Sequence, residues 1–337
     1  MELLRLEMVL PDWTAPPLTG DAAACLPAQS SGFGADIWYV LRTALLQALP
    51  QLRQCAALCL CVVAVMLLLS VIRGFAGTGK GAAELAGVVM LSTLLLSQAE
   101  EMVSAGVETV ETLAGYTTLL LPPLAATLAA QGGTTSSGAL YTLSASLSTL
   151  AGVGVKQLVA PAVYVFLVLA VIAAACGEET LCRLRDLVKK AAGMTLKTLL
   201  WGYTAFLSLT GLITGAADQA AVKATKMTIS GAVPVVGGIL SDASETILVS
   251  AGMVKNSVGI YGLVAVVAIC AGPVLSIGLQ YGLVKATAAV CAMFAGKKQV
   301  TVLADFAAAM ALLLAMTVTV GLLLLFSILC FLKGMSG

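Results

Sequence analysis

Three ionisable side chains inside an apolar stretch are the residues with the clearest capacity for chemistry. The stretch KMTISGAVPVVGGILSDASETILVSAGMVKN, residues 226–256, contains Asp242, Glu245 and Lys255. An ionised group at the centre of a bilayer costs roughly 2.5–3.5 kcal/mol on insertion scales, so such groups face water, a partner or the membrane surface. We therefore predict that these three side chains line a polar cavity. The alternative is a shallow segment whose charges lie among the lipid headgroups.

Covalent chemistry finds little support in the residue types present. The sequence contains no histidine, which removes Ser-His and Cys-His nucleophile pairs, HExxH zinc sites and imidazole proton relays. The nine cysteines lie mostly inside apolar runs, where buried free thiols are expected. The segment GFAGTGKG, residues 74–81, approaches a phosphate-binding loop but has Gly81 where the magnesium-binding hydroxyl belongs. We predict a protein that is not an enzyme, with no catalytic residue, no metal site and no cofactor.

Small residues and prolines accompany the three ionisable side chains. In lipid, glycines permit close approach of helix backbones, and prolines interrupt the helical hydrogen bonds. The positions expected to break or pack helices in this way are Gly231, Pro234, Gly237, Gly238, Gly252, Gly259, Gly262 and Pro273. Tight packing is the simpler alternative to a role in lining the cavity.

The composition identifies the kind of element that must position these residues. Of 337 residues, 60% are hydrophobic and 10% are charged, and the mean hydropathy is +1.03, whereas soluble domains are about one-quarter charged. Apolar runs such as residues 158–176 show no alternation, so they predict membrane helices and not strands of a β-barrel. The expected fold is an all-α, polytopic membrane protein.

Six strong spans and two weaker stretches are expected along the chain. The spans fall at about residues 55–72, 85–104, 157–176, 198–217, 258–284 and 306–331. Basic residues cluster in the connections at 73–80, 177–197 and 285–298, which the positive-inside rule places in the cytoplasm. The weaker stretches at 119–150 and 228–253 then enter and leave on the other side. Their limbs reach only about 18–22 Å as helix, so we expect short re-entrant or broken hairpins.

A faint internal repeat suggests how the chain is divided. A shift of 111 or 112 residues places Pro123 on Pro234 and Pro161 on Pro273, as expected for parallel repeats of two crossings each. The N-terminal part includes residues 36–49, whose spacing favours an interfacial helix, with a core helix as the alternative. The expected division begins with an N-terminal extracytoplasmic or interfacial segment at 1–54 and a first span with its cytoplasmic loop at 55–84. Two membrane repeats follow at 85–195 and 196–299, and a C-terminal span follows at 300–337.

Two adjoining stretches carry a resemblance to a known family. The segment MTISGAVPVVGGILSDASETILVSAGMVKNSVGIYGLVAV and the following CAGPVLSIGLQYGLVKATAAVC resemble the stage III sporulation protein AE family. The resemblance implies a multi-pass protein of endospore-forming bacteria, located in the mother-cell membrane that surrounds the forespore. It also implies membership of a channel-like complex between the two cells, with a ring-forming subunit and, indirectly, a cytoplasmic ATPase among its partners. The family offers no established catalytic residues.

Two functions from different classes remain after these observations. The first is a permease-like core or scaffold of that channel complex, and the alternative is a stand-alone secondary transporter of a small solute. A transporter moves its substrate alone in liposomes, whereas a channel subunit needs its partners. The lipid bilayer is the expected surroundings, and self-association into a homo-oligomer stays open. A net charge of +1 without a basic tract argues against a nucleic-acid partner.

Overall fold

Every element in the described part of the chain is a helix. The computed structural model describes residues 33–75, 80–130, 134–203, 205 and 237–334. In lipid, a chain segment must satisfy its own backbone hydrogen bonds, which a helix does and an isolated strand does not. The helices are α2 (Phe33–Phe75), α3 (Lys80–Ala130), α4 (Thr134–Gly154), the π-helix η3 (Val155–Val159), α5 (Ala160–Cys176), an unlabelled helix at 179–203, α7 (Gly237–Cys291) and α8 (Lys297–Gly334).

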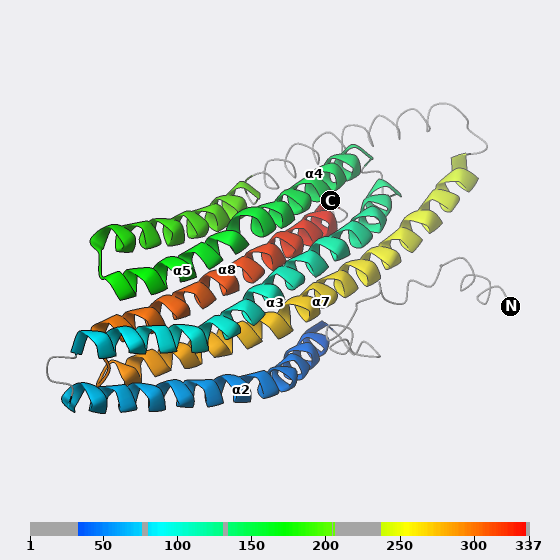
Figure 1. The fold of residues 1–337 in the computed structure, drawn as a ribbon. Helices are drawn as coiled ribbons and strands as arrows, with labels where there is room; N and C mark the ends of the chain where they lie inside the picture. The colour runs from blue at the N-terminus through cyan, green and yellow to red at the C-terminus, as the bar shows by residue number, and fades with distance from the viewer. Residues whose placement is uncertain (1–32, 76–79, 131–133, 204, 206–236, 335–337) are drawn as a thin grey trace.

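These helices pack side by side as an elongated bundle (Figure 1). Helix α8 lies inside it, against α3, α4, α5 and α7, and it is the most buried of the candidate membrane spans in the described residues. Its inward side chains include Met310, Leu313 and Phe331, each of which is no more than 2% exposed. The core is therefore a continuous apolar layer around α8, in which the other helices bury one face each.

Several helix ends lie together at one end of the bundle: the end of α2, the start of α3, the end of α5 and the turn between α7 and α8 (Figure 1). The Ser70 hydroxyl near the end of α2 donates to the carbonyl of Phe294, in the turn between α7 and α8, at 3.0 Å. The Lys298 ammonium at the start of α8 donates to the carbonyl of Ala175, near the end of α5, at 3.3 Å. We call this region the basic end, because it gathers the three connections that the sequence marks by their Lys and Arg clusters.

Five of the six predicted spans are confirmed as long apolar helices. The candidate spans are Ala35–Ile72, Glu84–Ala126, Ser144–Cys176, Gly262–Cys291 and Lys297–Leu329. The sixth prediction, at 198–217, lies mostly outside the described residues. Helix α3 has 51 residues and α7 has 55, which correspond to about 75–85 Å of helix, against a hydrocarbon core of about 30 Å. Both helices are therefore long enough to extend well beyond a bilayer.

The first predicted hairpin has longer limbs than expected. Helix α3 continues in one direction through residue 119 to Ala130, and α4 returns alongside it (Figure 1). The limbs are extensions of two long helices, because Pro122 and Pro123 stay within α3 and do not end it. Proline and glycine are tolerated in membrane helices when neighbouring helices offset the lost hydrogen bond. The prediction of short limbs was wrong here.

The second predicted hairpin also differs in the part that the structure describes. Residues 237–253 are the beginning of the continuous helix α7, not a short limb. Gly252, Gly259 and Gly262 lie within this helix, and so does Pro273. None of these four positions ends it, since a glycine costs only about 1 kcal/mol in a helix interior and packing offsets such a loss. The remainder of this stretch, including Gly231 and Pro234, lies outside the described residues.

The predicted interfacial helix is the first part of α2. This single helix contains Pro50 and joins residues 36–49 to the first span. Its inner face is made of small side chains, with Val40 and Ala44 buried against Val264 and Ala268 of α7. The larger apolar side chains point outward, as shown by Trp38, which is 70% exposed. The segment thus packs on the bundle through its small side chains and leaves its large apolar face exposed, as the interfacial interpretation expects.

Two local features shape the return from α4 to the basic end. Pro161 lacks the N–H that would bond four residues back, and just before it the chain forms η3, where the Ala160 N–H donates to the carbonyl of Val155. Gly177 then ends α5 in a left-handed conformation with φ 73°, and its N–H donates to the Ala173 carbonyl at 2.8 Å. This turn reverses the chain into the helix at 179–203.

The helix at 179–203 packs back against the bundle. Gly193 approaches Leu312 of α8, and Gly154 approaches Leu199, so the helix runs antiparallel to the rod formed by α4, η3 and α5. Only its beginning lies at the basic end. The predicted cytoplasmic connection at 177–197 is therefore a packed helix for most of its length, because Ala192, Leu196 and Tyr203 bury one of its faces.

Candidate functional site

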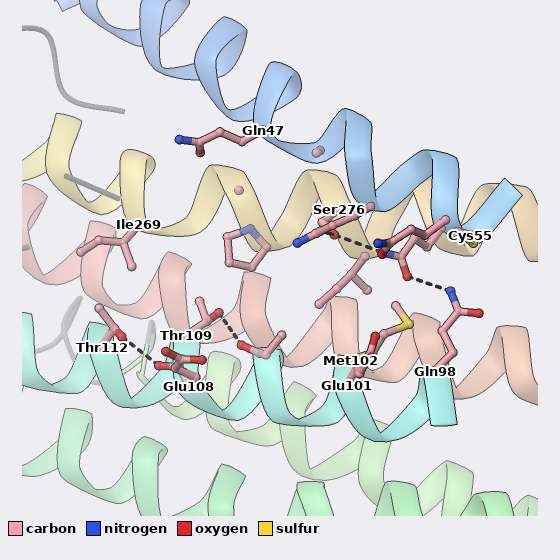
Figure 2. Close-up of a pocket in the computed structure, with 18 of the residues that line it drawn as sticks. Gln47, Cys55, Gln98, Glu101, Met102, Glu108, Thr109, Thr112, Ile269 and Ser276 are labelled. Carbon is pink, nitrogen blue, oxygen red and sulfur yellow. Dashed lines mark hydrogen bonds between the residues drawn. The ribbon is translucent and has the colours of Figure 1, made fainter. Parts of the chain in front are cut away.

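A polar groove of about 650 Å³ lies between α2, α3 and α7 (Figure 2). All three helices are candidate membrane spans, yet the described residues that line the groove include many amide, hydroxyl and carboxyl side chains. The polar members are Gln47, Gln51, Gln54, Ser97, Gln98, Glu101, Glu108, Thr109, Thr112, Ser276 and Gln280. A space of this size falls in the range of small-molecule sites, about 300–1,000 Å³.

A chain of hydrogen bonds crosses the groove and joins its three helices (Figure 2). Gln98 Nε2 of α3 donates to Gln280 Oε1 of α7 at 3.3 Å, and Gln280 Nε2 donates to Ser276 Oγ at 3.2 Å. The Ser276 hydroxyl then donates to Gln51 Oε1 of α2. We call these four residues the amide ladder. Gln280 is its central member and is only 8% exposed.

Helical periodicity explains why these polar groups meet. Gln47, Gln51 and Gln54 are four and three residues apart, so they share one face of α2. Ser276 and Gln280 are also four residues apart, on the face of α7 that meets α2. The ladder is therefore a polar stripe on each helix, buried where the stripes face one another.

The charge of the groove is negative. Glu101 and Glu108 are its acidic residues, and no lysine or arginine is among the described residues that line it. Both carboxylates lie on the α3 side and are exposed on the surface of the chain. The Thr109 and Thr112 hydroxyls beside them donate to carbonyls of their own helix, at 2.7 Å and 2.9 Å. The groove therefore favours cations and hydrogen-bond donors.

Pro273 adds an acceptor to the α7 wall. Because proline has no N–H, the carbonyl of Ile269, four residues earlier, lacks its usual helical donor. Both Pro273 and Ile269 line the groove. On the opposite wall, the side-chain oxygen Oε1 of Gln98 is buried and accepts no hydrogen bond.

A second cavity, of about 440 Å³, lies between α3 and the rod of α4 and η3. Lys156 Nζ of η3 contacts Glu111 Oε1 of α3 at 2.5 Å at its rim, and both side chains are more than half exposed. This pair offsets the charge of Glu111, which distinguishes the second cavity from the unneutralised groove.

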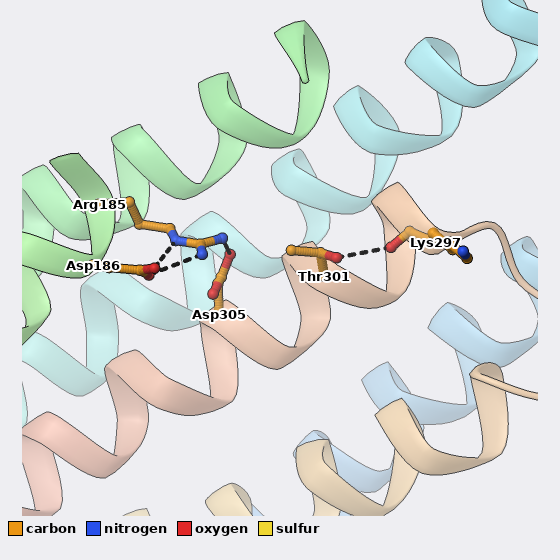
Figure 3. A network of polar contacts seen from close by, with 5 residues as sticks. All are labelled: Arg185, Asp186, Lys297, Thr301 and Asp305. Atoms are coloured by element: carbon orange, nitrogen blue, oxygen red, sulfur yellow. Dashed lines mark hydrogen bonds and ion pairs between the residues drawn. The ribbon is translucent and has the colours of Figure 1, made fainter. Parts of the chain in front are cut away.

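An ion pair near the basic end fixes the helix at 179–203 on α8 (Figure 3). Arg185 Nη1 donates to Asp305 Oδ2 at 2.7 Å, and the same guanidinium pairs with Asp186 at 2.9 Å. The side chains of Arg185 and Asp305 are only 13% and 12% exposed. Burial alone would lower the pKa of Arg185, but the hydrogen bonds and charges of Asp186 and Asp305 raise it above its ordinary value.

Among the predicted site residues, the structure describes the side-chain surroundings of Gly262 and Pro273. Helix α7 contains Asp242, Glu245 and Lys255, together with Gly237, Gly238, Gly252 and Gly259. The side-chain surroundings of residues 237–261 lie outside the described part. Gly262 lies where α7 crosses α3, since a Cβ there would be 3.1 Å from Leu120. Of these two described positions, Pro273 lines the groove and Gly262 does not. The cavity-lining role of Asp242, Glu245 and Lys255 remains a prediction.

The sequence does contain a signal for the groove. Its glutamines stand at helical spacing inside apolar helices, as in Gln47, Gln51 and Gln54, and an amide in such a setting needs a partner as a carboxylate does. A search restricted to charged residues within apolar runs passes over this pattern.

Comparisons with known proteins agree with the resemblance seen in the sequence. The family model described as stage III sporulation protein AE matches residues 34–334. The stage III sporulation protein AE of Bacillus subtilis (strain 168) is 24% identical over 201 residues, which cover 59% of this chain and 50% of that protein. The chain thus spans about half the length of this curated relative. No solved structure matches the chain.

Proposed function

The chain belongs to the stage III sporulation protein AE family, and we propose that it is a permease-like core or scaffold of a channel complex between mother cell and forespore. On this proposal it acts in the mother-cell membrane around the forespore. A ring-forming subunit and, indirectly, a cytoplasmic ATPase are its partners, and the chain performs no covalent chemistry of its own. The observation that carries the proposal is the α2/α3/α7 groove, which places hydrogen-bonding groups between three candidate membrane helices.

The groove favours a path or a polar contact surface over a purely structural bundle. An apolar interface would hold three helices without the desolvation cost of four amide and hydroxyl side chains. The amide ladder uses part of the hydrogen-bonding capacity of the walls, and the carboxylates remain available. Such a wall suits a solute or a polar segment of a partner that passes between the helices.

Blocking the groove tests this proposal. Ala105 lines the groove on α3, so Ala105→Trp fills it, whereas Leu96→Trp adds a similar bulk at an exposed position outside it. We expect Ala105→Trp to lower the yield of heat-resistant spores at least tenfold, with unchanged protein level and unchanged recovery of partner proteins. The Leu96→Trp strain should sporulate normally. Normal sporulation of both strains would remove the groove from the function.

The stand-alone transporter is distinguished by the purified chain. In liposomes, the channel subunit should show no solute flux without its partners, and a tagged chain from sporulating cells should recover them in fixed proportion. Solute uptake by the chain alone, together with the absence of such partners, would favour the transporter.

A further inference from the structure

The charged side chains that line the groove in the described part of the chain are both acidic. Glu101 and Glu108 have no lysine or arginine beside them among these lining residues, and the Ile269 carbonyl has lost its helical donor to Pro273. A carboxylate accepts hydrogen bonds and attracts cations. A ligand that pairs with both carboxylates is therefore positively charged and carries N–H groups.

The spacing of the two carboxylates indicates the length of that ligand. Glu101 and Glu108 are seven residues apart on one face of α3, which corresponds to about 10 Å along the axis. Side chains of a helix all tilt toward its N-terminus, so this separation persists at the carboxylates. Ala105 lies between them on the same face, and Pro273 and Ile277 line the α7 wall. The groove is thus anionic at two points and apolar between them.

We propose that the α2/α3/α7 groove binds a linear polyamine, with one terminal ammonium at Glu101 and the other at Glu108. An ammonium carries three N–H donors, which suit a carboxylate acceptor. The methylene groups then lie over Ala105, and the internal nitrogen faces the polar side chains of the α2 and α7 walls. Seven residues of helix span on the order of 10 Å, which is comparable to the separation of the terminal nitrogens in extended spermidine. This inference names a ligand class for the groove and rests on the proposed function only for its cellular role.

A metal ion fits the same residues poorly. Two carboxylates about 10 Å apart on one helix do not converge on a single cation, which needs its oxygen ligands within about 2.0–2.6 Å. Within the described residues there is also no group of three or more Cys, Asp or Glu side chains placed to hold a metal. The geometry separates the two anionic points, and a ligand with two separated charges matches it.

Binding to the purified full-length chain in lipid nanodiscs tests the proposal. Titration calorimetry with spermidine should show one site whose affinity falls at least tenfold in Glu101→Gln and in Glu108→Gln. Glu100→Gln is the matched control, because Glu100 is exposed on the same helix but does not line the groove, and it should bind as the wild type does. The shorter 1,3-diaminopropane should bind at least tenfold more weakly than spermidine. Magnesium at equal ionic strength should not displace spermidine.

Several outcomes would overturn the polyamine site. Unchanged affinity in both groove variants would do so, and so would an equal loss in Glu100→Gln, which would indicate nonspecific attraction to surface charge. Equal binding of the short diamine would contradict the two-point geometry. The sporulation assay tests the proposed function separately. If Ala105→Trp impairs sporulation but the wild-type chain does not bind spermidine, the proposed function stands and the polyamine site is contradicted.

Discussion

Gln280 joins α3 to the α2 side of the groove through a single amide group. It accepts from Gln98 and donates to Ser276, which in turn donates to Gln51. Hydrogen bonds between membrane helices contribute about 0.6 kcal/mol on average and up to about 1.7 kcal/mol. Each hydrogen bond of the ladder therefore contributes little to the free energy of folding, and the larger effect of the ladder is to fix which faces of the three helices meet.

Replacing Gln280 by leucine should loosen these helices. The change removes two hydrogen bonds and leaves Gln98 Nε2 buried without its acceptor, so we expect Gln280→Leu to lower the free energy of unfolding by roughly 1–2 kcal/mol. Thermal unfolding of the purified chain in detergent measures this loss. Gln54→Leu is the control, since Gln54 is exposed and lines the groove outside the ladder. An equal effect of the two changes would mean that the ladder adds nothing beyond general polarity.

At this scale the sequence predicts a polar cavity but not the residues of the groove. The cavity predicted at Asp242, Glu245 and Lys255 stays a prediction, and the groove that the structure shows is formed by other residues, apart from Pro273. The ladder was missed because an uncharged glutamine gives no strong signal in a hydropathy profile. Its burial depends on which helix faces its own, as with Gln98 and Gln280, which are 182 residues apart in the chain.

Among the helices, the one at 179–203 has the most polar attachment. Its contact with α8 combines apolar side chains with the buried pair of Arg185 and Asp305, whereas the Arg183–Glu179 pair on the same helix is more than four-fifths exposed. Removing one partner of a buried pair leaves an uncompensated charge and costs about 3–5 kcal/mol, while exposed pairs contribute about 0–1 kcal/mol.

Neutralising Asp305 should therefore detach this helix from α8. We expect Asp305→Asn to destabilise the folded chain by roughly 3 kcal/mol, near the lower limit for a buried pair because Asp186 still contacts Arg185. Glu179→Gln should change stability by no more than about 0.5 kcal/mol. Unfolding in detergent compares the two variants, and proteolysis between residues 177 and 203 reports detachment directly. A loss for Asp305→Asn no larger than that for Glu179→Gln would show that apolar packing alone holds the helix.

Helix type and approximate position follow from apolar run length, but helix ends and continuity do not. Five spans are predicted at the right places, while Pro50, Pro122, Pro123 and Pro273 each suggest an end that the structure does not contain. A proline costs about 3 kcal/mol in a helix interior, and contacts with neighbouring helices decide whether that cost is met. Such contacts, as between α2 and α7, are not visible in the order of residues along one helix.

The whole molecule has two unlike ends. Ten of the eighteen lysines and arginines belong to the three connections at 73–80, 177–197 and 285–298, and the structure brings the beginnings or ends of all three connections together at the basic end. The other end carries the start of α4 and the end of α8 (Figure 1). The helix at 179–203 leaves the basic end and α7 returns to it, as α3 leaves and the α4–η3–α5 rod returns. This is the order expected from the predicted parallel repeat, which stays a prediction.

The basic end should lie in the cytoplasm, because lysine and arginine near membrane spans are retained on that side. Single cysteines in a chain lacking its nine native cysteines test this orientation. Met293→Cys marks the turn between α7 and α8, where Met293 is 79% exposed, and Thr142→Cys marks the exposed face of α4 toward the opposite end. In intact cells that carry the protein in their cytoplasmic membrane, an impermeant thiol reagent should label Thr142→Cys and spare Met293→Cys. After the membrane is opened, both should react, which confirms that Met293→Cys was accessible in principle. Labelling of Met293→Cys from outside, with Thr142→Cys protected, would reverse the orientation of the bundle and place the second cavity with Lys156 on the cytoplasmic side.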